Sequence, residues 1–516
     1  MERHQPVNGV TRREFLSAAL IGLTQKSGPR VSGGFVFESQ IVGHQLRDRV
    51  PFSTPRETKH SPIVIVGGGI AGLSAAWRLQ KRGVTDFVVL EMEPVAGGNA
   101  RSGENGVSGY PWGAHYVPVP GASAGLVREL FTDLGVFDGR QWDERHLVHA
   151  PRERLFIHGR WQDGLEPAVG PTARDRAQFD RFEARIAQLH AAGRFTVPSA
   201  AGLTAGVAPP EDALSMAAWL EREGFDSPWL RWQVDYACRD DYGALSTDVS
   251  AWAGLYYFAA REPEEEGPLT WPEGNGWIVR RLLDRLGPRV TTGQVVYRVE
   301  KRGRGFRVRT PAIEWTADAV IMAAPLLVST RIVDGAPQSP VTYSPWFTAN
   351  LTLDRWPVEK QGEPAWDNVF YDSPSLGYVV ATHQHLKRFI PRTVWTYYHA
   401  LAHDRPERAR RWLLDQSWDS LKTQILADLS RAHPDIERCV SRVDIFRIGH
   451  AMVRPTVGFL SDPVRRALQA GSERFRYAHS DLSGLPLFEE AQYRGVVAAD
   501  AVIGDLEGRP GRQGGL

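Results

Sequence analysis

A glycine-rich turn between a strand and a helix constrains the fold of this chain more than any other feature. Residues 61–66 are a compact run rich in β-branched residues, and the glycines of 67–72 then interrupt it. Over 70–82 the apolar residues recur with helical spacing, and 87–91 is a second candidate for a buried strand. A strand, a crossover helix and a second parallel strand form a βαβ unit that is buried on both faces. The sequence therefore predicts a doubly wound α/β domain of the Rossmann type.

The glycine turn has the spacing that binds the pyrophosphate of a dinucleotide. It matches Gly-x-Gly-x-x-Gly directly after a strand, with Ile70 and Ala71 opening the helix. Gly67 permits the tight turn, Gly69 lets the pyrophosphate approach the backbone, and Gly72 allows helix and strand to pack closely. The positive end of the helix dipole offsets the phosphate charge.

An acidic residue follows the second strand at the distance that such a site requires. Glu91 lies 19 residues after Gly72, where its carboxylate can accept both ribose hydroxyls of an adenosine. A carboxylate at this place disfavours a 2′-phosphate. FAD or NAD is therefore expected rather than NADP.

The next segment distinguishes between these two dinucleotides. Residues 91–101, Glu-Met-Glu-Pro-Val-Ala-Gly-Gly-Asn-Ala-Arg, resemble the second stretch of the flavin-containing amine oxidoreductases, a family that includes amine oxidases, phytoene desaturases and protoporphyrinogen oxidases. The family's glycine pair, here Gly97 and Gly98, lets the chain pass close to the flavin diphosphate. The family usually places Arg directly after the pair, whereas this chain has Asn99 there and Arg101 two positions later. The resemblance implies FAD, with Arg101 as the candidate phosphate contact.

Three further segments carry the same resemblance toward the end of the chain. Residues 110–116, Tyr-Pro-Trp-Gly-Ala-His-Tyr, resemble the segment that runs under the isoalloxazine ring, where Gly113 and Ala114 would supply the close backbone approach. Residues 294–299 resemble the strand whose backbone meets the adenine, with Val296 as the expected contact.

The third segment, residues 476–495, is similar to the C-terminal flavin-binding stretch of the family. There an acidic residue caps the ribityl chain before a helix that points at the flavin, and Asp481 matches that acid. Taken alone, Asp481 could equally be an ordinary carboxylate at a helix entry.

The elements expected along the chain indicate an FAD-binding domain with an inserted mixed α+β substrate domain. Helices are predicted over 173–190, 213–223, 277–286 and 407–432, a hairpin over 294–310, and strands over 319–324, 348–353 and 393–399. The predicted division is 1–45 for an export signal and flexible approach, 60–160, 271–335 and 446–506 for the FAD-binding domain, 161–270 for an inserted helical region, 336–445 for a substrate-domain sheet with its helix, and 507–516 for a mobile tail.

The N-terminus resembles a twin-arginine export signal. Residues 11–16, Thr-Arg-Arg-Glu-Phe-Leu, precede a short apolar stretch and then two basic residues, Lys26 and Arg30. The apolar stretch is about half of the ~20 residues that span a bilayer, so no stable membrane span is expected. This resemblance implies the twin-arginine machinery as a partner and a periplasmic location. The alternative is an ordinary basic N-terminus with a chance arginine pair, in a cytoplasmic protein.

Charge and cysteine content exclude several classes of partner. The chain has 61 basic and 60 acidic residues, so no net field draws it to nucleic acid. Its two cysteines, Cys238 and Cys439, have none of the spacings of metal sites, and no metal is expected. Whether they form a disulfide stays open. A small organic substrate fits this composition.

The segments that would bind substrate depart from the family pattern. Many members have a lysine that faces flavin N5 through water, but the comparable residues 344–356 contain none, and Lys360 is the nearest. Phe488 could provide one of the family's two aromatic walls, while 450–455 offers no second aromatic residue. His450 or Arg454 in that region could face a polar substrate or be structural.

His115 is the one titratable residue that the sequence places beside the expected flavin ring. With a pKa near neutral it could exchange a proton while hydride leaves for N5. The alternative is a partly buried histidine that only binds backbone.

The resemblance implies an FAD-dependent oxidoreductase that transfers hydride from a small organic substrate to flavin N5, with amines or polyamines as the first expectation. Oxygen or another acceptor would then take the electrons. One alternative is a desaturase or isomerase acting on a polyene or a porphyrin-like ring. Others are a non-catalytic flavin-binding protein and an NAD-dependent dehydrogenase, against which the C-terminal flavin segment argues.

Overall fold

The computed structural model describes residues 31–204, 206–261, 267–359, 361–385 and 390–508. The arginine pair of the expected export signal and the C-terminal tail from residue 509 lie outside these ranges. Within them, no helix is both long and apolar enough to cross a membrane.

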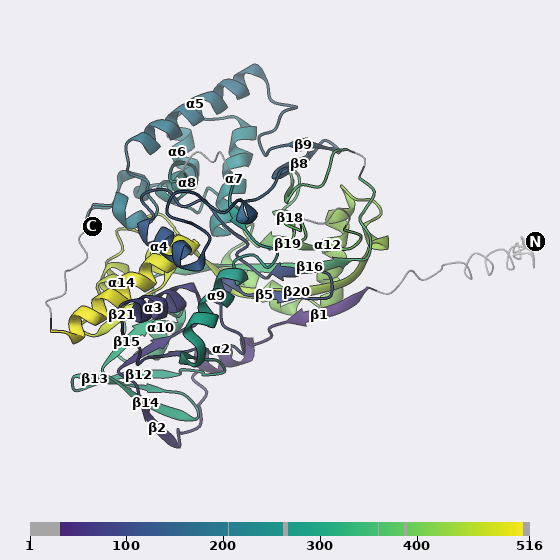
Figure 1. Ribbon diagram of the computed structural model, residues 1–516. Coiled ribbons are helices and arrows are strands. Elements are labelled where there is room, and N and C mark those ends of the chain that lie inside the picture. Colours follow the sequence, from purple (N-terminus) through teal and green to yellow (C-terminus); the bar gives the residue numbers. More distant parts are fainter. Residues whose placement is uncertain (1–30, 205, 262–266, 360, 386–389, 509–516) are drawn as a thin grey trace, which may run out of the picture.

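A five-stranded parallel sheet carries the glycine turn (Figure 1). Every neighbouring pair in it is parallel. The strand order is β11 (Val290–Thr291), β4 (Val88–Leu90), β3 (Ile63–Val66), β15 (Ala319–Met322) and β21 (Phe475–Tyr477). The central strands β3 and β15 are buried along their whole length, as expected for strands covered on both faces. The doubly wound α/β prediction is confirmed.

Helices α3 (Ile70–Lys81) and α14 (Phe488–Leu506) pack against each other beside this sheet, with α9 (Gly276–Leu286) also against α3 (Figure 1). Their contact is unusually close, because a Cβ on Gly495 would lie 2.1 Å from the Ala71 carbonyl oxygen. Helix α3 ends at the predicted place, since Gly83 follows it with a φ of +81°.

The predicted hairpin forms, but it begins later than expected. In a separate four-stranded sheet, β12 (Arg298–Arg302) and β13 (Gly305–Arg309) pair antiparallel, followed by β14 (Ile313–Ala317) and β2 (Glu57–His60). The prediction of a strand from residue 294 was wrong for 294–297. The Gln294 N–H donates to the Glu91 carbonyl oxygen at 2.7 Å, which holds the start of this stretch at the end of β4, and the Tyr297 N–H at its end donates to the Arg309 carbonyl oxygen of β13 at 3.0 Å.

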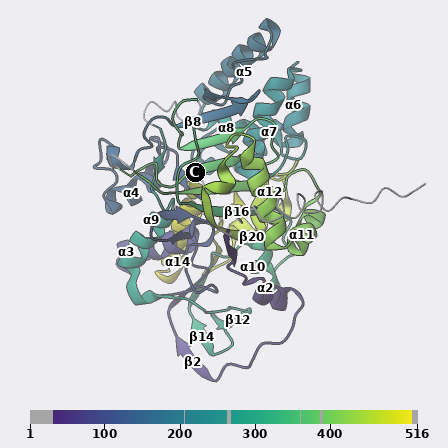
Figure 2. The same ribbon diagram turned by 90° about the vertical axis from the view of Figure 1, so that its right-hand side faces the viewer.

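The second main body is an eight-stranded mixed sheet. In order, its strands are β1 (Ser32–Val36), β20 (Val440–Arg454), β16 (Thr342–Leu353), β19 (Thr393–Ala400), β18 (Gly377–Val380), β17 (Asp367–Phe370), β8 (Glu153–Ile157) and β9 (Arg160–Asp163). Helices α11 (Pro406–Asp415) and α12 (Trp418–Ser430) pack on it (Figure 2).

Three expectations about this sheet and its helices were wrong. Residues 32–36 are not a flexible approach, because β1 pairs with β20, and α2 (Gln40–Arg47) follows. Residues 153–160 belong to the large sheet, because β8 pairs with β17. The single helix expected over 407–432 is divided, since the Ser417 side chain accepts the Ser420 N–H and starts a new helix.

A group of helices occupies one end of the molecule, away from the four-stranded sheet (Figure 2). These helices are α5 (Ala173–Ala191), α6 (Met216–Arg222), α7 (Pro228–Tyr242) and α8 (Ala251–Ala259). Helix α5 starts with a capping box between Thr172 and Asp175. The helical character predicted for this region is therefore observed, and α7 contacts β20 of the eight-stranded sheet.

Candidate active site

Two glycine turns lie side by side at the carboxyl ends of β3 and β4. The Gly97 N–H donates to the Gly68 carbonyl oxygen at 2.8 Å, and Gly69 and Gly97 form an isolated bridge. A Cβ on Gly98 would lie 3.4 Å from the Gly69 Cα. The two backbones can approach this closely because neither turn carries a side chain here.

The glycines of the first turn are required for different reasons. Gly67 has a φ of +108°, and a Cβ on Gly72 would lie 1.9 Å from the Gly67 carbonyl oxygen. A Cβ on Gly69, by contrast, would meet only the Gly98 Cα, at 3.9 Å. Space is thus left open beside Gly69, at the N-terminus of α3, where Ile70 is the first helical residue. An anion can approach the helix at this point.

Glu91 is fixed next to this turn by two backbone donors. Its Oε2 accepts the Gly68 N–H at 2.6 Å and its Oε1 accepts the Glu93 N–H at 2.8 Å. Burial raises the pKa of Glu91, while the two hydrogen bonds act in the opposite direction. A carboxylate has about four lone-pair positions, so acceptor capacity for two hydroxyls remains.

Arg101 lies against the second turn and has an unused donor. Its Nε donates to the Gly98 carbonyl oxygen at 3.0 Å, and its guanidinium stacks over the rings of Phe37 and Phe446. Nη1 is buried, lies 3.6 Å from Glu93, and donates no hydrogen bond within the described residues. Burial lowers the pKa of Arg101. A buried guanidinium nitrogen that has one ion-pair contact but no hydrogen bond, beside a glycine pair, fits a diphosphate.

The segment expected under the flavin ring, residues 110–116, packs against the backbone that follows the second glycine turn. A Cβ on Gly113 would lie 2.4 Å from the Asn99 carbonyl oxygen, which also accepts the Ala114 N–H at 2.9 Å. The Tyr398 hydroxyl donates to the Gly113 carbonyl oxygen at 2.9 Å. Gly113 is therefore required by its contact with the chain itself, independently of any ligand.

His115 lies in an aromatic environment. Its ring is stacked on Tyr398 at 4.8 Å between centroids, with Tyr116 at 5.0 Å and Trp366 at 5.4 Å. Burial lowers the pKa of His115 to about 4. The imidazole ring is therefore uncharged at physiological pH. The proton-exchange role predicted for His115 assumed a pKa near 7, which the structure does not support.

Strand β16 passes behind this segment with amide and hydroxyl side chains. Thr348 Oγ1 donates to the Trp112 carbonyl oxygen at 2.9 Å, and Asn350 Nδ2 donates to the Pro111 carbonyl oxygen at 2.9 Å. The strand in which the family usually carries a lysine thus supports the backbone of 111–112 instead. Lys360 lies outside the described residues.

Asp481 is almost completely buried just before α14, in the short helix η7 (Ser480–Leu482). Its carboxylate accepts the Leu326 N–H at 2.9 Å and the Tyr343 hydroxyl, and lies 3.1 Å from His479 Nδ1. Burial acts to raise the pKa of Asp481, but these partners together hold it below its usual value. Val296, the proposed adenine contact, is buried in the loop beside Glu91.

Three residues considered for substrate contact have structural partners. Phe488 is stacked on Phe131 at 5.8 Å in the core, so it does not form an aromatic wall. Arg454 pairs with Asp248 at 2.5 Å, and the His450 ring lies edge-on to Tyr343.

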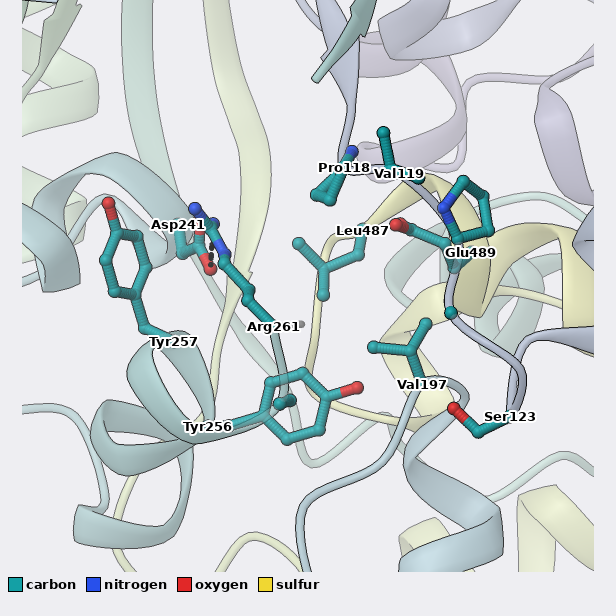
Figure 3. Close-up of a pocket in the computed structure, with 13 residues that line it drawn as sticks. Pro118, Val119, Ser123, Val197, Asp241, Tyr256, Tyr257, Arg261, Leu487 and Glu489 are labelled. Carbon is teal, nitrogen blue, oxygen red and sulfur yellow. Dashed lines mark hydrogen bonds and ion pairs between the residues drawn. The ribbon is translucent and has the colours of Figure 1, made fainter. Parts of the chain in front are cut away.

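A small cavity adjoins this segment, between its continuation at 118–123, helices α7 and α8, and the start of α14 (Figure 3). Its volume is about 40 Å³. Arg261 pairs with Asp241 at 3.2 Å and donates to the Tyr116 hydroxyl at 3.5 Å. Glu489, which is 3% exposed, lies across the cavity from this pair, with Leu487 between them (Figure 3). Sequence reasoning missed this group because its members come from three distant parts of the chain.

Burial raises the pKa of Glu489 to about 7, with smaller effects from Arg261, Glu490 and Asp241. The folded protein therefore binds a proton on Glu489 that the unfolded chain loses above its ordinary pKa of 4.5, so stability should fall as pH rises from 4.5 to about 7. We expect Glu489→Gln to stabilise the protein by up to about 3 kcal/mol at pH 8 and by little at pH 5.

Urea denaturation at both pH values measures this difference. Glu473→Gln, at a residue whose side chain is 71% exposed, is the matched control and should change neither value. An equal gain for Glu489→Gln at pH 5 and pH 8 would contradict the assigned protonation.

Comparison with known proteins agrees with the family resemblance seen in the sequence. The model of a family described as flavin containing amine oxidoreductase matches residues 70–503. A probable flavin-containing monoamine oxidase A from Dictyostelium discoideum is 26% identical over 191 residues, which cover 36% of this chain and only 38% of that protein.

Solved structures show the same fold at low sequence identity. A variant of putrescine oxidase superposes with a TM-score of 0.68 at 16% identity, covering 86% of this chain and 99% of its own. Cyclohexylamine oxidase from Brevibacterium oxydans gives 0.66 at 16% identity, with 87% and 99% covered. A fatty acid isomerase from P. acnes gives 0.62 at 16% identity, with 84% and 97% covered. On the extent of the family match, this chain belongs to the flavin-containing amine oxidoreductase family.

Proposed function

We propose that the chain binds one FAD along the carboxyl ends of the parallel strands. The pyrophosphate would lie against the open side of the two glycine turns, near Arg101, and the adenosine ribose would bind Glu91. The open side of Gly69 and the unused Nη1 of Arg101 support this placement. Val296, Ala114 and Asp481 are the proposed contacts to adenine, ring and ribityl chain.

We propose further that the enzyme is an FAD-dependent oxidoreductase acting on a small amine. The observation that carries this proposal is the pair of acidic residues at the small cavity of Figure 3, where Asp241 and Glu489 lie near one arginine, Arg261. Above about pH 7, where Glu489 loses its proton, an ammonium group is favoured there and a carboxylate is not. When bound, FAD would accept hydride from the carbon next to nitrogen, and oxygen or another acceptor would reoxidise it. The protein orients the substrate and excludes water.

The direct test is the visible spectrum of the purified protein. Flavin absorption that bleaches when one of a panel of amines is added anaerobically supports the proposal. Acid release of the cofactor, followed by chromatography, distinguishes FAD from FMN. A colourless protein that fails to take up added FAD would overturn it.

A desaturase or isomerase is the second candidate. It is favoured by a cavity of about 560 Å³ between α5, α7 and α8, which is lined partly by phenylalanines and partly by polar residues such as Glu183 and His190, and by the absence of lysine from residues 344–356. Bound FAD that no amine bleaches, but that supports conversion of a polyene or an unsaturated fatty acid, would select this candidate.

Arg101→Met is expected to weaken FAD binding by about 10- to 100-fold, because a charge-assisted hydrogen bond is worth about 1.5–3 kcal/mol. Titration of the apoprotein with FAD, followed by flavin fluorescence, measures this affinity. Arg128→Met is the control, since Arg128 also stacks over a phenylalanine, Phe137, but lies on α4 (Gly125–Leu134). Equal affinities for the two variants would exclude Arg101 as a phosphate contact.

For the whole chain we propose the seven-part division given above with two changes: the first segment ends at residue 31 instead of 45, and the first FAD-binding segment ends at residue 152 instead of 160.

We also propose export by the twin-arginine route. Replacing both Arg12 and Arg13 by Lys should then retain the protein in the cytoplasm. Cell fractionation measures this. An unchanged distribution would leave the N-terminus as an ordinary basic segment.

A further inference from the structure

Strand β1 carries the start of the described chain toward the proposed flavin site. It forms one edge of the eight-stranded sheet, where all of its residues pair in parallel with β20 (Figure 1). It lies flush on that strand, because a Cβ on Gly33 would lie 1.8 Å from the Val443 carbonyl oxygen. Residues 37–39 follow outside the strand and contact the residues around the second glycine turn. We call residues 32–39 the N-terminal strap.

Phe37, where the strap leaves the sheet, adopts a backbone conformation that phenylalanine rarely takes. Its φ is +54°, in the left-handed region that is strained for a bulky side chain. The Ser39 N–H donates to the Phe37 carbonyl oxygen at 2.8 Å and closes a tight turn. The ring lies edge-on to Trp112 and Phe446, at 5.6 and 5.2 Å between centroids. Strained conformations of this kind persist where the surroundings fix them, and they gather at ligand sites.

The Phe37 ring supports the guanidinium of Arg101. The guanidinium carbon lies 4.6 Å from the centroid of Phe37 and 5.1 Å from that of Phe446. Nε donates to the Gly98 carbonyl oxygen, so two rings and one backbone acceptor orient the group. Nη1 is left buried and without a hydrogen bond in the described chain. The strap thus contributes one of the contacts that orient the donor proposed to meet the diphosphate.

Ser39 restrains the acidic neighbour of Arg101. Its hydroxyl donates to Glu93 Oε1 at 2.5 Å. The other oxygen, Oε2, lies 3.6 Å from Arg101 Nη1, which is within ion-pair range but too long for a hydrogen bond. A carboxylate that was free to turn would accept hydrogen bonds from the guanidinium and compete with a phosphate for them. The hydrogen bond from Ser39 opposes this competition because it retains Oε1.

Resting on the proposed FAD site, we propose that the N-terminal strap completes the site for the flavin diphosphate. Phe37 and Ser39 are positioning residues: the first stacks on Arg101 and the second restrains Glu93, so that Nη1 of Arg101 stays available to the diphosphate. Docking of the strap and binding of FAD then strengthen each other by the same factor, as linkage requires. Detachment of the strap weakens FAD binding, and loss of FAD loosens the strap.

Two phenylalanine substitutions test the stacking contact. Phe37→Leu should weaken FAD about three- to tenfold in a fluorescence titration of the apoprotein, the size expected of one cation–π contact. Phe137→Leu is the matched control and should leave the affinity unchanged, because Phe137 stacks on Arg128 at the same distance of 4.6 Å. In an Arg101→Met background Phe37→Leu should have no further effect. A role in general packing would lower the affinity in both backgrounds.

The restraint on Glu93 has its own test by the same titration. Ser39→Ala should weaken FAD about tenfold. Ser32→Ala removes a hydrogen bond to the Ser441 carbonyl oxygen from the same strap and should have little effect. Glu93→Gln removes the competing charge, so it should bind FAD at least as tightly as the unaltered protein. In that background Ser39→Ala should lose its effect.

Hydrogen exchange measures the coupling in the opposite direction. Amides of β1 should exchange more slowly in the FAD-loaded protein than in the apoprotein. Amides of β9, at the other edge of the same sheet, should exchange equally in both. Phe37→Leu should reduce the protection of β1 by FAD.

The proposal is overturned if Phe37→Leu and Phe137→Leu bind FAD equally well, or if FAD slows exchange in β1 and β9 alike. Weaker FAD binding by Glu93→Gln would contradict the role given to Ser39. An apoprotein that takes up no FAD would overturn the proposed function, and this inference with it.

Discussion

Gly495→Ala is expected to destabilise the protein by about 1–3 kcal/mol, the usual cost of inserting a methyl group into a packed interface. The new Cβ would lie 2.1 Å from the Ala71 carbonyl oxygen and 3.0 Å from the Ala75 nitrogen. Both atoms belong to the backbone of α3, so no side-chain rotation relieves the clash. Either α14 or α3 must move.

Gly504→Ala, in the same helix, is the matched control. No atom lies within 4 Å of its Cβ position, and alanine should stabilise the helix there by about 0.4–1 kcal/mol. Urea denaturation of both variants gives the difference between their free energies of unfolding. The effect of helix propensity cancels in this difference, because both substitutions replace glycine by alanine in α14. Equal stabilities would show that the close contact of α3 with α14 is not required.

This contact also bears on the cofactor site. Helix α3 begins at the glycine turn, so a shift of α3 away from α14 displaces the N–H groups proposed to face the pyrophosphate. Gly495→Ala should therefore retain less flavin than Gly504→Ala after gel filtration. Loss of stability without loss of flavin would separate the packing role of Gly495 from the site.

Local patterns predicted the part of the fold that carries the glycine turns. Strand, turn and helix over residues 61–91 are encoded by neighbouring residues, and their bounds differ from the structure by one or two positions. The pairing of β1 with β20, more than 400 residues later, has no such local signal. The same is true of β8, which joins β17 rather than the parallel sheet.

The candidate site divides in the same way. Glycine spacing and Glu91 could be recognised because the residues that need each other are close in sequence. The stacking of Arg101 on Phe37 and Phe446, and the low pKa of His115, arise from burial by distant segments. Residue type alone therefore gave His115 an ordinary pKa, which its surroundings do not support.

Asp481→Ala is expected to cost about 3–5 kcal/mol, because it leaves buried partners of a carboxylate without an acceptor. The Leu326 N–H and the Tyr343 hydroxyl both donate to it, and His479 lies 3.1 Å away. Asp481→Asn keeps one oxygen for the Leu326 N–H and should cost less. Chemical denaturation of the flavin-free protein measures both values.

Tyr343→Phe extends this series into a double-mutant cycle. Because the hydroxyl and the carboxylate contact each other, Tyr343→Phe and Asp481→Ala should be non-additive by about 1–3 kcal/mol. Additive effects would mean that Leu326 and His479 account for the role of the carboxylate.

Repeating the cycle in the flavin-loaded protein separates structure from cofactor binding. A ligand stabilises the folded state according to its affinity, so a variant that also loses a flavin contact is penalised more when FAD is present. Asp481→Ala should therefore cost more in the loaded than in the flavin-free protein, whereas Tyr343→Phe should cost the same in both. If Asp481→Ala costs the same in both states, Asp481 supports the entry to α14 and does not bind the ribityl chain.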